Sequence, residues 1–141
     1  MDLKNAIVSK FKKENNLTYE KNQISVGAGG KQVIYNAFLA TINSGDEIII
    51  PSPFWVSYPD IVLLAGGIPK IIECGEEDNF KLTAKSLKKN ITQKTKWLII
   101  NSPGNPTGSC YSEQEINELV DVLVKYCLLY TSDAADEGLG V

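Results

Sequence analysis

The chain alternates between stretches in which apolar residues recur every three or four positions and short runs that are apolar throughout. The first kind of stretch is typical of helices that pack by one face. It predicts helices over residues 2–15, 31–42, 83–90 and 112–124, and one that follows an aromatic segment and ends near 65. The second kind predicts short strands at 23–26, 47–50, 68–73 and 95–100.

Strands and helices therefore alternate along the chain, which indicates an α/β fold with a mostly parallel sheet and helices on both faces. Pro69 places the strand over 68–73 near the sheet edge or at its own start. Residues 1–126 are expected to form one partial domain. Residues 127–141 break the pattern, because the next apolar strand is due there and 130–137 are polar and small. We interpret 127–141 as a tail that is either not native to the gene or a frayed terminus.

Composition excludes several classes of protein. The chain has 141 residues, 43% of them hydrophobic and 22% charged, which is an ordinary globular balance. A net charge of −3 provides no basic footprint for nucleic acid. No run approaches the ~18 apolar residues that a membrane-spanning helix needs. The N-terminus has no apolar signal core, so we expect a cytoplasmic protein that binds neither membrane nor nucleic acid.

Cysteine and histidine content limits the chemistry further. Cys74, Cys110 and Cys127 are odd in number and form no CxxC pair, so reduced thiols are expected. The chain contains no histidine, which excludes His-based triads and His-containing zinc sites within it, and no metal site is predicted. Proton transfer by this segment would have to use Lys, Asp, Glu, Tyr or Cys.

Three loops leave the predicted carboxyl ends of strands, where open α/β sheets bind ligands. Residues 27–32 are glycine-rich and precede a helix, whose N-terminal amides can hold an anion. Residues 52–55 carry Trp55, which can stack on a flat ligand. Residues 101–108 hold two prolines and two glycines and offer the Asn105 amide. Each loop alone can be a plain tight turn or core packing. Together they fit a flat, phosphorylated ligand with an exocyclic oxygen, which pyridoxal phosphate satisfies.

The segments GAGGKQ, SPFWVSYPD and NSPGNPTG, at these separations, resemble class I aminotransferases of the fold-type I pyridoxal-phosphate superfamily. The resemblance covers about residues 3–126 and is greatest to bacterial aspartate aminotransferases, including those that also accept prephenate. It implies that this chain is part of the large domain of such an enzyme.

The resemblance also implies roles for individual residues. Gly29, Gly30 and Lys31 match the turn whose backbone amides hold the cofactor phosphate. Trp55 matches the aromatic residue that stacks on the pyridine ring and lies beside the substrate. Asn105 matches the asparagine that bonds the phenolic oxygen of the ring, helps to set the pKa of the bound cofactor and touches the substrate carboxylate.

Two details accompany these roles. Tyr58 lies where relatives vary and has a lesser, supporting part. The family often has cis prolines at the positions of Pro53 and Pro106.

The family's other functional groups are expected outside this chain. These are the Schiff-base lysine, the tyrosine that bonds the cofactor, the arginine that binds the α-carboxylate and the aspartate that pairs with the ring nitrogen. Asp133 falls near the spacing of that aspartate, but Ala134 and Ala135 follow it where the family differs, so the role is not assigned to it. We therefore predict no catalytic residue within the chain and no turnover by the chain alone.

The resemblance predicts that the complete, homodimeric enzyme moves an amino group from aspartate or a related amino acid to 2-oxoglutarate. Three alternatives stay open at this point. The chain could be the aminotransferase-like domain of a transcriptional regulator, a lyase or synthase of the same fold, or a doubly wound domain that binds another phosphate compound.

Overall fold

The structure is a computed structural model that describes residues 2–132. It consists of two compact units, Met1–Val33 and Ile34–Val141, each described below by itself. No helix within 2–132 combines the length and the apolar content that crossing a bilayer requires.

The first unit begins with helix α1 (Leu3–Asn15), as predicted. Asp2 caps its first turn by accepting a hydrogen bond from the Lys4 amide at 3.2 Å. Asn16 ends it in the left-handed conformation, at φ 55°, and the Phe11 ring then packs edge-on against Tyr19 at 5.6 Å. The segment after the helix therefore packs back against it through the Phe11–Tyr19 contact.

The predicted strand over 23–26 was wrong. A short 3₁₀ helix, η1 (Lys21–Gln23), occupies the start of this segment, and no strand follows it. The Gln23 side-chain oxygen accepts from the Glu20 amide at 2.7 Å, and the Gln23 amide donates to the Glu20 carbonyl at 2.9 Å. Such local bonds compete with strand pairing, and only two residues of the run are apolar.

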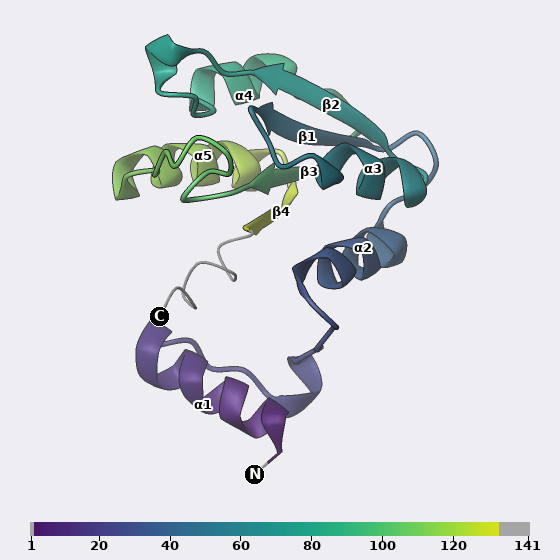
Figure 1. Cartoon of the computed structure of the whole chain (residues 1–141), viewed down its shortest axis with the longest axis vertical. Coiled ribbons are helices and arrows are strands. Elements are labelled where there is room, and N and C mark those ends of the chain that lie inside the picture. The colour runs from purple at the N-terminus through teal and green to yellow at the C-terminus, as the bar shows by residue number, and fades with distance from the viewer. Residues whose placement is uncertain (1, 133–141) are drawn as a thin grey trace. The chain divides into compact units, whose positions relative to one another are not determined.

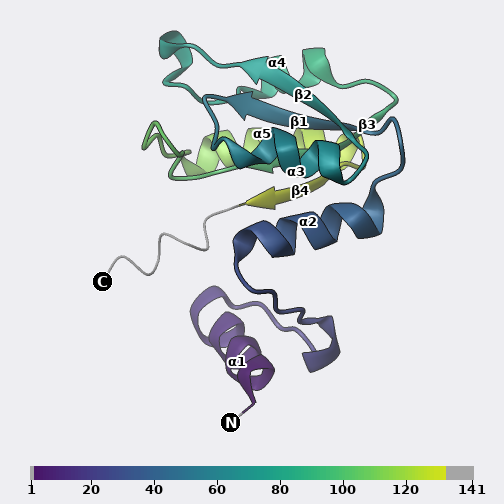
Figure 2. The ribbon, with the colours of Figure 1, turned by 45° about the vertical axis from the view of Figure 1, so that its right-hand side comes forward.

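The second unit contains a four-stranded sheet in the order β2-β1-β3-β4. The strands are β1 (Glu47–Ser52), β2 (Ile68–Glu73), β3 (Thr95–Ile100) and β4 (Leu129–Ser132). All three pairings are parallel, and the arrows point the same way in Figure 2. The predicted parallel α/β architecture is therefore confirmed, and β2, which carries Pro69, lies at an edge as expected.

Strand β4 was not predicted. Its four residues pair with Trp97–Ile100 of β3, although only Leu129 and Tyr130 are apolar. Backbone pairing with a neighbouring strand thus defines this element, rather than its own pattern. The rest of the proposed tail, including Asp133, lies outside the described residues.

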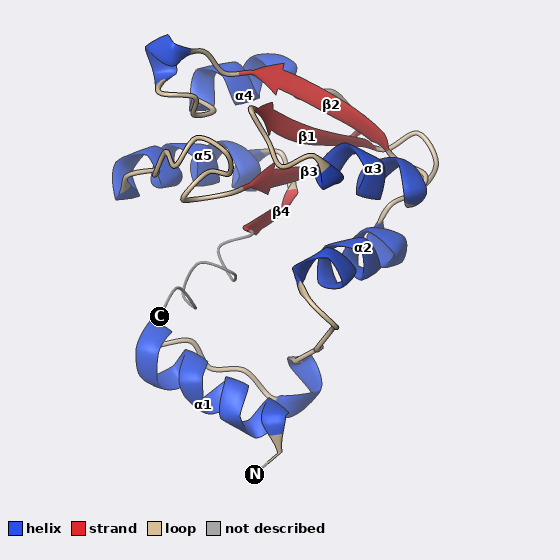
Figure 3. Cartoon of the chain, in the orientation of Figure 1, coloured by secondary structure: helices blue, strands red, loops and turns tan. Residues whose placement is uncertain are grey.

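Helices cover both faces of the sheet, as predicted (Figures 1 and 3). The helices are α2 (Gly30–Thr41), which starts in the first unit, α3 (Ser57–Leu64), α4 (Ala84–Asn90) and α5 (Glu113–Lys125), with a 3₁₀ turn η2 (Glu76–Asp78). Alternation along β1 sends Ile48 and Ile50 to the core formed with α2 and α3, and Ile49 to the core formed with α4 and α5. Both cores therefore share one central pair of strands.

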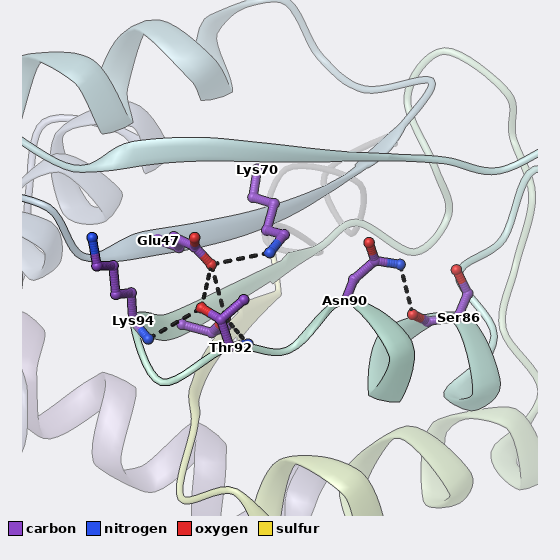
Figure 4. A network of polar contacts seen from close by, with 7 residues as sticks. Glu47, Lys70, Ser86, Asn90, Thr92 and Lys94 are labelled. Carbon is purple, nitrogen blue, oxygen red and sulfur yellow. Dashed lines mark hydrogen bonds and ion pairs between the residues drawn. The ribbon is translucent and has the colours of Figure 1, made fainter.

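A polar network ties the amino ends of β1 and β3 together (Figure 4). The Glu47 carboxylate accepts from Thr92 Oγ1 at 2.7 Å, and from Lys70 Nζ and Thr95 Oγ1 at 3.2 Å each. Burial opposes ionisation of Glu47, but these bonds outweigh it and hold its pKa below the ordinary value. The amino ends of these strands are thus joined by stabilising side-chain contacts. Ligands of open α/β sheets bind at the opposite, carboxyl ends of the strands.

Candidate active site

A pocket lies at the carboxyl ends of β1 and β3, within the second unit. Three segments line it: the end of β1 with the following loop, the residues before α4, and the loop after β3. The residues that shape it include Pro53, Phe54, Tyr58, Lys81, Asn101, Asn105 and Tyr111. The structure thus brings two of the three predicted loops to one pocket.

The loop after β1 supplies the aromatic side. A cis Ser52–Pro53 bond ends the strand, as the resemblance implied, and Phe54 faces the pocket. Trp55 is partly buried and packs edge-on against Tyr58, with ring centroids 5.6 Å apart and planes at 84°. Tyr58 is 2% exposed and itself lines the pocket, whereas Trp55 is not among the lining side chains. Trp55 therefore stands beside the pocket, supported by Tyr58.

The loop after β3 is braced internally. The Gly104 amide donates to the Ser109 carbonyl at 2.8 Å, and the Gly108 amide donates to the Gly104 carbonyl at 2.6 Å. Gly108 has φ 72°, which favours glycine, and a Cβ on Gly104 would lie 2.8 Å from Thr107 Oγ1. The Asn105–Pro106 bond is cis, as the resemblance implied, and Ser102–Pro103 is cis as well. The two amide hydrogen bonds brace the loop that carries Asn105.

Asn101 adds a feature that the motifs did not indicate. It follows β3 directly, and its side-chain oxygen is buried without a hydrogen-bond partner among the described residues. A buried acceptor without a partner costs about 1–3 kcal/mol. Because Asn101 lines the pocket, a donor on a bound molecule or on another segment of the protein would satisfy it.

The glycine loop lies in the first unit, so its geometry is local. Gly29 has φ 112°, and α2 begins at Gly30. The Gly29 carbonyl accepts from the Gln32 and Val33 amides at 3.1 and 3.2 Å, while the Gln32 side chain accepts from the Ala28 amide at 2.5 Å. Gly29, Gly30 and Lys31 therefore form the tight entry to a helix, the kind of place where backbone amides bind anions.

These residues fit pyridoxal phosphate in their chemistry. The second unit offers aromatic side chains next to an asparagine and a buried acceptor that lacks a partner. The glycine turn offers the N-terminus of a 12-residue helix for a phosphate. Within residues 2–132, no group of three or more His, Cys, Asp or Glu is arranged to hold a metal.

Comparison with known proteins decides the family. The sequence model of the protein family described as aminotransferase class I and II matches residues 1–140. The chain belongs to this family.

Several relatives of this aminotransferase chain have aspartate aminotransferase in their names. It is 58% identical over 124 residues to a probable aspartate/prephenate aminotransferase from Rickettsia conorii, covering 88% of the chain and 31% of that protein. Among solved structures, the aspartate aminotransferase of Rhizobium meliloti matches with a TM-score of 0.88 and 43% identity, over 93% of this chain and 33% of the other. The aspartate aminotransferase of Thermus thermophilus with maleate matches with a TM-score of 0.87 and 38% identity, over 92% and 34%.

The aminotransferase chain thus spans about a third of the length of these relatives. Their names favour an aminotransferase over a transcriptional regulator or a lyase of the same fold. Membership of the family implies pyridoxal phosphate as cofactor.

Proposed function

We propose that the complete protein transfers an amino group from aspartate, or a related amino acid, to 2-oxoglutarate with pyridoxal phosphate. The observation that carries this proposal is the pocket where the aromatic loop after β1 meets the Asn105 loop after β3, in a chain of the aminotransferase family. The name of the Rickettsia relative and the maleate complex of the Thermus relative support a dicarboxylic substrate. The first name also supports prephenate as a second amino acceptor.

The residues of this chain would bind and orient the cofactor and the substrate. The backbone amides of Gly29, Gly30 and Lys31 would hold the phosphate at the entry to α2. Trp55, fixed by Tyr58, would stack on the ring and border the substrate, and Asn105 would donate a hydrogen bond to the phenolic oxygen. Asn105 would also contact the substrate carboxylate. When bound, the cofactor supplies an electron sink for charge that develops on the substrate's α-carbon.

Proton transfer falls to a group outside these residues. Lys81, which lines the pocket, already forms an ion pair with Glu115 at 2.5 Å. We therefore place the Schiff-base lysine elsewhere in the complete enzyme and expect no turnover by this chain alone. We also propose that the complete enzyme is a cytoplasmic homodimer.

The test is to titrate the complete enzyme with pyridoxal phosphate and to measure cofactor binding by absorption spectroscopy. Asn105→Ala should weaken binding about tenfold or more, because a hydrogen bond to a charged group is lost. Trp55→Ala should weaken both cofactor and substrate binding, because the stacking surface is removed. Val56→Ala is the matched control, since that neighbouring side chain is 75% exposed. Unchanged affinity and kinetics in both site variants would contradict the proposal.

A further inference from the structure

Lys81, in the segment before α4, contacts the far end of the loop after β3 that carries Asn105 (residues 101–111, the Asn105 loop). Its Nζ lies 2.5 Å from Glu115 Oε1 and donates to the Cys110 carbonyl at 3.4 Å. It also stands 5.9 Å from the centroid of the Tyr111 ring. The lysine side chain is only 15% exposed, so these contacts form in a partly desolvated place.

Tyr111 makes a second contact between the Asn105 loop and the segment before α4. Its hydroxyl accepts a hydrogen bond from the Leu82 amide at 2.7 Å, so two neighbouring residues, Lys81 and Leu82, bind the end of the loop. The Tyr111 amide donates to Ser102 Oγ at 3.1 Å, which ties the end of the loop to its beginning. Asn105 lies between these two fixed points.

The charge of Lys81 is already matched. Among the described residues that line the pocket, Lys81 alone carries a charge, and Glu115 is its partner. Glu115 also accepts from the Ser112 amide at 2.7 Å, in the capping box that starts α5. The ammonium group therefore links the pocket wall to the helix that follows the loop, and its charge is not reserved for a ligand.

We propose that Lys81 is a positioning residue for Asn105. Together with Tyr111 it holds residues 101–111 against the segment before α4, so that the Asn105 amide is already placed when the ligand arrives. This inference rests on the proposed function, because it takes the phenolic oxygen of pyridoxal phosphate as the partner of Asn105. Preorganised contacts of this kind lower the ordering cost of binding.

The experiment compares variants of the complete enzyme. Lys81→Met removes the charge and keeps most of the stem, and Tyr111→Phe removes only the hydroxyl. Lys81→Arg keeps a cation that can reach the same carboxylate and serves as the rescue variant. Lys85→Met is the matched control, because Lys85 is an exposed lysine of α4, outside the pocket.

The first measurement needs no ligand. Amide hydrogen exchange at Gly104, Gly108 and Tyr111, whose amides all have acceptors in this loop, reports how often the loop opens. Lys81→Met should speed exchange about tenfold, as expected for loss of a charge-assisted contact, and Tyr111→Phe should do so to a smaller extent. Lys81→Arg should restore most of the protection, and Lys85→Met should leave it unchanged.

The second measurement follows the bound cofactor. The midpoint of the pH titration of its visible absorption should shift in Lys81→Met in the same direction as in Asn105→Ala, but by less. A purely stabilising lysine would lower the melting temperature without moving this midpoint. Lys81→Arg should bring the midpoint back.

The outcomes separate the two proposals. If the unchanged enzyme fails to bind pyridoxal phosphate, the proposed function itself is overturned. If it binds, and Lys81→Met behaves like Lys85→Met in both measurements, only the positioning role is overturned. Tighter phosphate or cofactor binding in Glu115→Gln would overturn it too, since that result would make Lys81 a direct anion ligand.

Discussion

The indole Nε1 of Trp97 donates a hydrogen bond to Thr41 Oγ1 over 2.9 Å. Trp97 belongs to β3 and Thr41 is the last residue of α2, so this bond joins the helix to the sheet. The Thr41 hydroxyl in turn donates to the Ala37 carbonyl at 2.7 Å, and the Trp97 ring packs edge-on against Phe38 at 5.4 Å. The one polar atom of this large core side chain is thereby satisfied.

Replacing Thr41 by Val should destabilise the protein by about 1–3 kcal/mol, because it leaves the buried indole N–H without an acceptor while keeping the side-chain shape. The measurement is urea unfolding followed by tryptophan fluorescence. Thr18→Val, at an exposed position, is the control and should have little effect. Equal stability of the two variants would show that the indole bond contributes nothing.

Glu47 should be more sensitive to neutralisation than Glu73, the other glutamate in the described strands. Glu47→Gln keeps the size of the side chain but removes the charge that meets Lys70, so we expect a loss of about 1 kcal/mol in the free energy of unfolding. The matched control is Glu73→Gln, at the exposed carboxyl end of β2. Guanidinium unfolding of the three proteins checks this, and a loss as large in Glu73→Gln would refute the assignment.

The pKa of Glu115 is lowered from 4.5 to about 2, first by the hydrogen bond from Lys81 and then by those from the Ser112 amide and hydroxyl. Since the folded state lowers this pKa, the stabilisation is complete above pH 4.5 and is lost as pH falls toward 2. Lys81→Met should move the pKa back toward 4.5, and Lys85→Met should not. Carbon-detected NMR titration of the Glu115 carboxyl measures both, and an unmoved value in Lys81→Met would remove Lys81 as the main cause.

The three cysteines should differ in reactivity. Burial raises the pKa of the Cys74 thiol to about 11, and the charge of Asp78 adds to this, while Cys110 and Cys127 are exposed. Because the thiolate is the reactive form, iodoacetamide at pH 8 should label Cys110 and Cys127 first and Cys74 only when the protein opens. Peptide mass spectrometry gives the three rates, and labelling of Cys74 as fast as Cys110 would contradict its buried placement.

Prediction from the sequence succeeded where the local pattern and the tertiary environment agree. Thr95–Ile100 is a strand with the predicted bounds, because its apolar run is buried on both faces of the covered sheet. Ile68–Glu73 also has the predicted bounds, as a partly exposed strand at the sheet edge. It failed over 23–26, where the Gln23 side chain accepts a hydrogen bond from the Glu20 amide and favours a 3₁₀ turn. It also failed at β4, whose residues become a strand by pairing with β3.

The site shows the same division. The positions of Asn105 and of the aromatic loop beside one pocket could be predicted, because both loops follow apolar strands of a parallel sheet, whose carboxyl ends meet at one edge. The contact between the Lys81 segment and Tyr111 could not be predicted, because the two are 30 residues apart in the sequence. Both also lie in segments without a periodic pattern, so nothing local distinguishes either residue. Their pairing with Glu115 and Leu82 exists only in the folded chain.

The sequence by itself determined the class of fold, most of the helices and strands and the loops that follow β1 and β3, since these depend on neighbouring residues along the chain. The tertiary structure alone decided which strands pair, that Trp55 packs against Tyr58 beside the pocket, and that Lys81 contacts the Cys110 carbonyl and Glu115. Contacts between residues distant in sequence depend on how the chain packs, and a single pattern of polar and apolar residues permits many such packings.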